Sequence, residues 1–88
     1  MRAVVTVVGK DRPGIIAKVS TLLFENNMNI LDISQTIMSE DIFSMIMLVD
    51  MKSSVVADVS EKLAALASEI GMSIHLQNEE LFNSMHRI

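Results

Sequence analysis

Residues 3–15 of the chain, AVVTVVGKDRPGI, contain a short β-branched run, a charged turn and the beginning of an apolar helix pattern. The β-branched run is bounded by Gly9, which is typical of a buried strand. Pro13 suits the first turn of a helix, because the N–H that proline lacks would be unpaired there. Asp11 is placed to cap that helix. This stretch therefore predicts a strand at 3–8, a tight loop and a helix in direct succession.

Similar patterns continue along the chain and predict a hairpin, a second helix, a last strand and a short terminal helix. The first helix is expected to end at Asn26-Asn27, where asparagine accommodates a left-handed turn, and the second helix at Gly71. In the first strand of the hairpin, Leu31, Ile33 and Ile37 share one face, and Asp32, Ser34 and Thr36 share the other. The predicted elements are strands at 29–38 and 42–51 joined by a turn at 39–41, a helix from 53–54, a strand at 72–77 and a helix opening at 78–80.

The order of these elements, β-α-β-β-α-β, predicts a ferredoxin-like α+β fold with two helices on one face of a four-stranded antiparallel sheet. A short C-terminal helix follows. No linker or low-complexity tract interrupts the sequence, so we expect residues 1–88 to form one domain. A helix as short as the terminal one is marginal in water and is expected to dock on another surface.

Both faces of the predicted strand 42–51 are apolar, although two helices can cover only one face of the sheet. The uncovered face would expose an apolar patch, and burial by a second copy predicts a symmetric homodimer. The alternative is that the terminal helix folds back across this face. The two sets are Phe43, Met45, Met47, Val49 and Met51 on one side and Ile42, Ile46 and Leu48 on the other.

Charge and composition narrow the classes of function. The chain has a formal net charge of −4, which argues against a general nucleic-acid binder. It has no cysteine, which removes disulfides and thiolate chemistry. Residues 1–3 show no leader pattern, and no apolar run is long enough to cross a membrane, so we expect a cytoplasmic protein. An RNA-recognition module would need stacking aromatic residues, and Phe43 is the only aromatic residue in the predicted strands.

The positive charge is concentrated at the start of the chain, where residues 1–18 carry +3 and the remainder carries −7. In the first loop, two glycines allow close approach of the backbone, and the amides and dipole at a helix start favour an anion. The predicted binding residues are Gly9, Lys10, Asp11, Arg12, Pro13, Gly14 and Ile15 as the wall of a pocket, and Asn29 and Ile30 as its floor. The alternative is purely structural, with Asp11 as a cap, Pro13-Gly14 as a turn, and Lys10 and Arg12 solvated.

The loop Asp11-Arg12-Pro13-Gly14-Ile15, with Asn29-Ile30 fifteen residues beyond Gly14, resembles the ACT-domain signature. The resemblance spans nearly the whole chain and is greatest to small stand-alone ACT proteins similar to the regulatory protein of the glycine cleavage system. It implies a small-molecule ligand, such as an amino acid, bound at a domain interface, and a regulated protein partner. In serine-binding members, the positions matching Asp11 and Asn29 hold the ligand. Such members have a histidine where this chain has Gly9, which argues against serine.

We expect this chain to have no catalytic residue, no cofactor and no metal site. His75 lies on the polar face of the last strand, and neither it nor His86 has a second ligand at a recognisable spacing. Two alternatives stay open. One is a dimer that only contacts a protein partner. The other is an acylphosphatase-like hydrolase using Arg12 and Asn29, although the loop lacks the glycine-flanked arginine cradle of that family.

Overall fold

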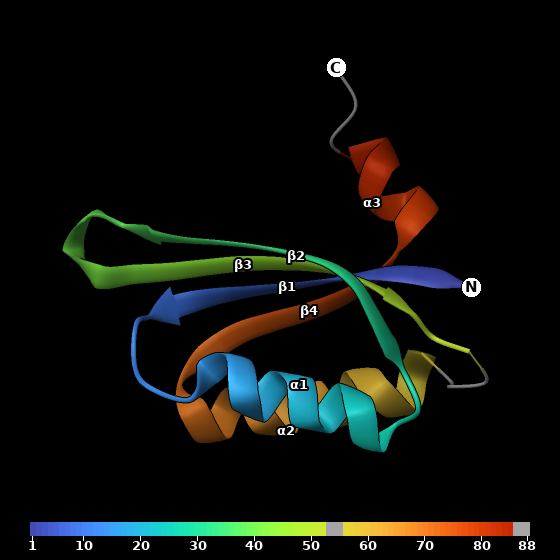
Figure 1. Cartoon of the computed structure of the whole chain (residues 1–88), viewed down its shortest axis with the longest axis horizontal. Coiled ribbons are helices and arrows are strands. Elements are labelled where there is room, and N and C mark those ends of the chain that lie inside the picture. Colours follow the sequence, from blue (N-terminus) through green and yellow to red (C-terminus); the bar gives the residue numbers. More distant parts are fainter. Residues whose placement is uncertain (53–55, 86–88) are drawn as a thin grey trace.

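The computed structural model describes residues 1–52 and 56–85, which form a four-stranded antiparallel sheet in the order β2-β3-β1-β4. Helices α1 and α2 lie against one face, and α3 rises from the other side (Figure 1). The predicted ferredoxin-like βαββαβ fold with a short terminal helix is confirmed. The elements are β1 (Arg2–Lys10), α1 (Ile15–Glu25), β2 (Asn29–Met38), the 3-10 turn η1 (Ser39–Asp41), β3 (Ile42–Asp50), α2 (Val56–Ile70), β4 (Met72–Asn78) and α3 (Glu79–Met85).

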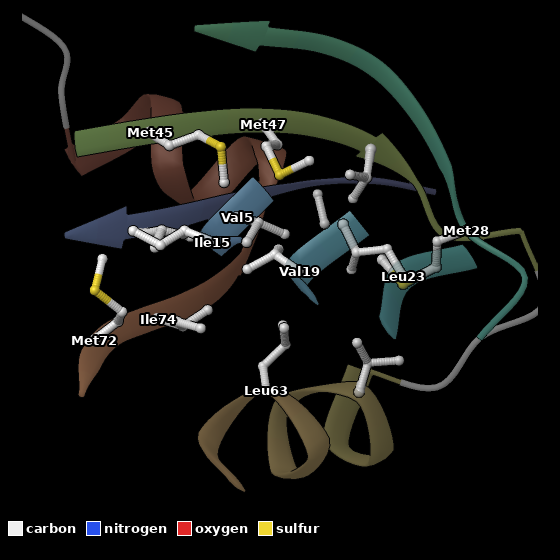
Figure 2. Packing of buried hydrophobic residues seen from close by; sticks show 14 of the residues in the cluster. Val5, Ile15, Val19, Leu23, Met28, Met45, Met47, Leu63, Met72 and Ile74 are labelled. Carbon is white, nitrogen blue, oxygen red and sulfur yellow. The ribbon is translucent and has the colours of Figure 1, made fainter. Parts of the chain in front are cut away.

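The core lies between the sheet and the two helices, because alternate residues of β1 and β3 point toward them. Val5 of β1 and Met47 of β3 are both fully buried and pair directly across the two strands. Figure 2 shows them above the apolar stripe of α1, with Leu63 of α2 facing the same space. Five methionines belong to this core, which fits the use of flexible thioethers to fill irregular gaps. They are Met28, Met45, Met47, Met51 and Met72.

Two predictions about the first helix are wrong. Helix α1 begins at Ile15, its N-cap is Gly14 with φ 89°, and no side chain of the described residues caps it. Pro13 therefore precedes the helix instead of forming its first turn. Asp11 lies too far before Ile15 to cap it, and its own N–H donates to the Asp41 carbonyl at 2.7 Å. The loop is thus positioned by a contact distant in sequence.

The helix ends agree better with the sequence patterns. Asn27 has φ 60° and closes α1, and Gly71 has φ 68° directly after α2, so both predicted left-handed positions are confirmed. Strand β1 is longer than predicted at both ends, and β4 ends one residue later than predicted. The predicted start of the second helix at residues 53–54 lies outside the described residues.

The sheet leaves apolar residues uncovered in two places. On the side away from α1 and α2, Val8, Met38 and Ile46 are each 43–46% exposed, which confirms that β3 is apolar on both faces. The edge strand β2 alternates as predicted, but its apolar residues are also exposed because the helices leave much of β2 uncovered. These residues are Leu31, Ile33 and Ile37.

Helix α3 covers only one end of the open side of the sheet. Its first turn is capped by Asn78, whose Oδ1 accepts hydrogen bonds from the N–H of Glu80 at 2.8 Å and of Leu81 at 3.2 Å. The Arg2 guanidinium donates to both carboxylate oxygens of Glu79, at 3.0 and 2.5 Å. The exposed fraction on this side of β1 rises from 5% at Val4 to 43% at Val8. The terminal helix therefore does not seal the open face.

Candidate functional site

The first loop is held on both sides by bonds to backbone carbonyls. The Lys10 ammonium donates to the Glu40 carbonyl at 3.2 Å, at the turn between β2 and β3. The Arg12 Nη1 donates to the Ile70 carbonyl at 3.0 Å, where a cation also meets the negative end of the α2 dipole. Neither cation is merely solvated. Each uses a donor to fix the loop and still contributes positive charge to its surroundings.

A hollow of about 460 Å³ lies between this loop, the first turn of α1 and the β2–β3 hairpin. This volume falls in the range of pockets that hold small molecules. The first turn of α1 has no capping side chain among the described residues, so its amide donors favour an anionic group nearby. Gln35 adds an amide, and Phe43 adds an apolar wall. The lining residues are Asp11, Arg12, Gly14, Ile15, Ile16, Ala17, Gln35 and Phe43.

Four of the predicted binding residues line this hollow, and three neighbours in the loop do not. Gly9 pairs with Phe43 of β3, and a Cβ there would stand 2.5 Å from the Met72 sulfur, so Gly9 permits a close packing contact within the fold. Lys10 binds the hairpin turn, and Pro13 shapes the loop before α1. The four residues in the hollow are Asp11, Arg12, Gly14 and Ile15.

Asn29 and Ile30 lie at the opposite end of the sheet, so within one chain they do not form a floor beneath the loop. Lys10 pairs with Ile42 at the start of β3, whereas Asn29 pairs with Asp50 at its end. Eight residue steps of an extended strand separate these ends by about 27 Å. The predicted arrangement is wrong for a single chain, because α1 carries the chain back along the sheet before β2 begins.

The surroundings of Asn29 form a smaller hollow with a charged neighbour. Asn29 lines it together with Lys52 and Phe24, and Phe24 is 79% exposed. The nearby Asp50 carboxylate accepts a hydrogen bond from the Lys52 N–H at 3.0 Å, which lowers the pKa of Asp50 together with the Lys52 and N-terminal charges. This end of the sheet thus offers an amide, an apolar ring and a fixed carboxylate.

Four lining residues lie outside the predicted set: Ile16 and Ala17, which simply continue α1, and Gln35 and Phe43, which come from the hairpin. Gln35 stands between Ser34 and Thr36 of the predicted polar face, but its own partner across the hairpin is the buried Met45. Gln35 therefore lies on the helix side, beside the start of α1. The hairpin register could have revealed this, since Gln35 falls between Ile33 and Ile37 in the alternation.

Two further features of the described residues bear on other functions. In residues 1–52 and 56–85, no three acidic or histidine side chains gather as a metal site would require. None of the described helices has the length and apolar character needed to cross a membrane.

A second hollow of about 340 Å³ lies between α1 and α2, where Leu22 and Leu66 contribute to an open, apolar surface.

Comparison with known proteins gives a consistent result. A sequence model described as the ACT domain matches residues 2–77. A UPF0237 protein of Clostridium acetobutylicum is 52% identical over 90 residues, covering 100% of both chains. The structure of an ACT domain protein from Streptococcus pneumoniae has a TM-score of 0.83 at 34% identity, covering 93% of each chain. The crystal structure of a proposed glycine cleavage system transcriptional repressor has a TM-score of 0.76 at 29% identity, covering 86% of this chain and 44% of that chain. The resemblance expected from residues 11–15 and 29–30 is confirmed.

Proposed function

We propose that this chain, which belongs to the ACT domain family, binds an amino acid or a similar small anion and acts as a regulatory homodimer. The observation that carries the proposal is the uncapped first turn of α1, which faces a hollow containing Arg12 and Gln35. A ligand carboxylate would accept hydrogen bonds from the helix amides, as anions do at helix starts. Gln35 and Phe43 would contact the remainder of the ligand. Residues 1–88 would act as one domain in the cytoplasm.

The second copy supplies the residues that one chain leaves at the far end of its sheet. Strand β2 is a ten-residue edge strand, and such edges readily pair with another strand. Antiparallel pairing of β2 with β2 of a second copy would bring Asn29 of that copy beside Met38, at the end of the sheet that holds the loop. Leu31, Ile33 and Ile37 supply exposed apolar contacts along this edge.

The mechanism is linkage between ligand and assembly. A ligand that contacts both copies stabilises the arrangement in which the two parts of the site meet, and a protein partner would distinguish that arrangement from the free dimer. The eight described residues that line the hollow include one carboxylate and one guanidinium but no paired nucleophile and base. We therefore propose a binding role without catalysis.

The hydrolase alternative fits the geometry poorly. It would need Arg12 and Asn29 to act on one phosphate, but the strand register places them at opposite ends of the sheet. The Arg12 guanidinium also donates to the Ile70 carbonyl. A dimer that only contacts a protein partner is the remaining alternative, and it differs from the proposal in having no small ligand.

Thermal unfolding with each of the twenty amino acids tests the proposal. A ligand at ten times its Kd stabilises the folded state by about 1.4 kcal/mol, which raises the Tm of a domain this small by roughly 6–11 °C. We expect such a shift with one amino acid or a few related ones. It should be lost in Gln35→Ala and in Asn29→Ala, and kept in the control Ala64→Glu on the exposed side of α2. No shift with any amino acid would leave the dimer without a ligand as the better account.

A further inference from the structure

The first loop contacts the turn from α2 into β4 at two separate points. The Arg12 Nη1 donates to the Ile70 carbonyl at 3.0 Å, at the last residue of α2. Where β1 runs into the loop, Gly9 lies so close to this turn that a Cβ there would stand 2.5 Å from the Met72 sulfur. Figure 1 shows the loop and the turn at the same end of the molecule. We call residues 70–72 the α2–β4 junction.

The two main helices end in different ways. Residues 26–28 close α1 with backbone N–H groups that donate to the carbonyls of residues 22–24, at 3.0–3.2 Å. At the end of α2, the Ile70 carbonyl accepts a hydrogen bond from a side chain of the first loop. The last four carbonyls of a helix have no partner within it, and a cation beside them meets the negative end of the dipole. The order of the last turn of α2 therefore depends on the loop.

Arg12 also lines the loop hollow, so one side chain touches both the hollow and the junction. A guanidinium has five N–H donors in a rigid planar fork. The bond to the Ile70 carbonyl uses Nη1, and an anionic group in the hollow can be met by the donors of the other two nitrogens. Hydrogen bonds between a guanidinium and a carboxylate are stronger than those to a neutral carbonyl. A carboxylate in the hollow would therefore hold Arg12, and Arg12 would hold the end of α2.

We propose that Arg12 couples occupancy of the hollow to the order of the α2–β4 junction, so that this junction is the part of the fold that reports ligand binding to a protein partner. The inference rests on the proposed function and adds its regulation. A ligand held by Arg12 restrains the last turn of α2, and by thermodynamic linkage a partner that restrains this turn tightens ligand binding by the same factor. Arg12 is thus a positioning residue, because its effect on the partner passes through Ile70.

Hydrogen exchange of the full-length chain, followed by mass spectrometry, tests the inference. The probe is whichever of the twenty amino acids raises the Tm of the wild-type chain most. At saturation we expect exchange at residues 67–72 to slow by about fivefold or more, the lower end of the usual coupling between sites. Arg12→Ala and Arg12→Lys should keep the slower exchange in the first turn of α1 but lose it at residues 67–72, because neither side chain has the fork that joins two acceptors. The control Lys18→Ala, at an exposed position, should behave as wild type.

The outcomes separate this inference from the proposed function. A bond that only braces the fold would make exchange faster in Arg12→Ala with and without the probe, but the probe would not slow exchange at residues 67–72 in wild type. Slowing confined to the loop in wild type, or slowing at residues 67–72 that persists in Arg12→Ala, would overturn the inference and leave ligand binding intact. If no amino acid raises the Tm, the proposed function fails and the inference fails with it.

Gly71→Ala provides a second test from the side of the junction. Gly71 has φ 68°, where an L-residue is strained, and it does not line the hollow. We expect this variant to raise the Kd of the probe severalfold. Ala64→Gly, which disturbs the exposed middle of α2, should leave the Kd unchanged. An unchanged Kd in Gly71→Ala would contradict the coupling.

Discussion

Replacing Gly14 with L-alanine should destabilise the fold, whereas D-alanine at the same position should stabilise it. Gly14 has φ 89°, and a Cβ built there meets nothing within 4 Å. The L-alanine substitution therefore tests backbone conformation without a clash. An L-residue forced into this region loses roughly 1–2 kcal/mol. A D-residue prefers positive φ and gains about 0.4–1 kcal/mol by restricting the unfolded chain.

The measurement is urea unfolding followed by circular dichroism, on chains of 88 residues made by chemical synthesis so that either enantiomer can be placed. For a domain of this size, 1 kcal/mol corresponds to roughly 4–8 °C in Tm. We expect the free energy of unfolding to fall with L-alanine and to rise with D-alanine, at an unchanged m value. Equal destabilisation by both enantiomers would contradict the account, because the positive φ at the start of α1 penalises only the L-residue.

Three further predictions concern the loop and its supports. Gly9→Ala should lower the free energy of unfolding by about 1–3 kcal/mol, because its Cβ would stand 2.5 Å from the Met72 sulfur. Urea titration should show that adding Met72→Ala in the double variant recovers part of this loss. Arg12→Ala should lower the free energy of unfolding by about 1–2 kcal/mol, because it removes the donor to the Ile70 carbonyl at the end of α2. The control Lys18→Ala, at an exposed position, should change it little. Differential scanning calorimetry of the two variants checks this. The Arg2 hydrogen bonds lower the pKa of Glu79 below its ordinary value of 4.5. They therefore stabilise the fold above pH 4.5 and lose their effect as the pH falls through the lowered pKa. A profile of Tm from pH 6 to pH 3 should be flatter in Glu79→Gln than in wild type, and an unchanged slope would contradict the pairing.

Much of the fold was predictable because strands and helices leave local periodic patterns. The alternation through Ile33 and the helical spacing after Ile15 gave the correct element order. The capping of α1 was not predictable in the same way. The Asp11 N–H donates to the Asp41 carbonyl, and the Arg12 guanidinium donates to the Ile70 carbonyl. Both contacts join residues far apart in sequence, so no local pattern contains them.

Four of the eight residues that line the hollow were predicted from the sequence. The loop residues were found because glycine, proline and charge are conspicuous in a short segment. Gln35 and Phe43 enter the hollow only through the register of the hairpin, which pairs Gln35 with Met45 and Phe43 with Gly9. Asn29 was placed beside the loop because of its position in a signature. A helix that follows a strand returns the chain to the other end of the sheet, and that topology separates Asn29 from the loop.

Mixing two inactive variants tests the central claim, that one copy supplies the loop hollow and the other supplies Asn29. Gln35→Ala disables the loop side and Asn29→Ala the edge side, so each variant alone should bind none of the amino acid that stabilises the wild-type chain. After co-refolding in equal amounts, half of the dimers should be mixed, and each mixed dimer should hold one intact site of its two. Isothermal titration should then recover about a quarter of the wild-type binding capacity at unchanged Kd. No recovery in the mixture would contradict a site shared between two copies.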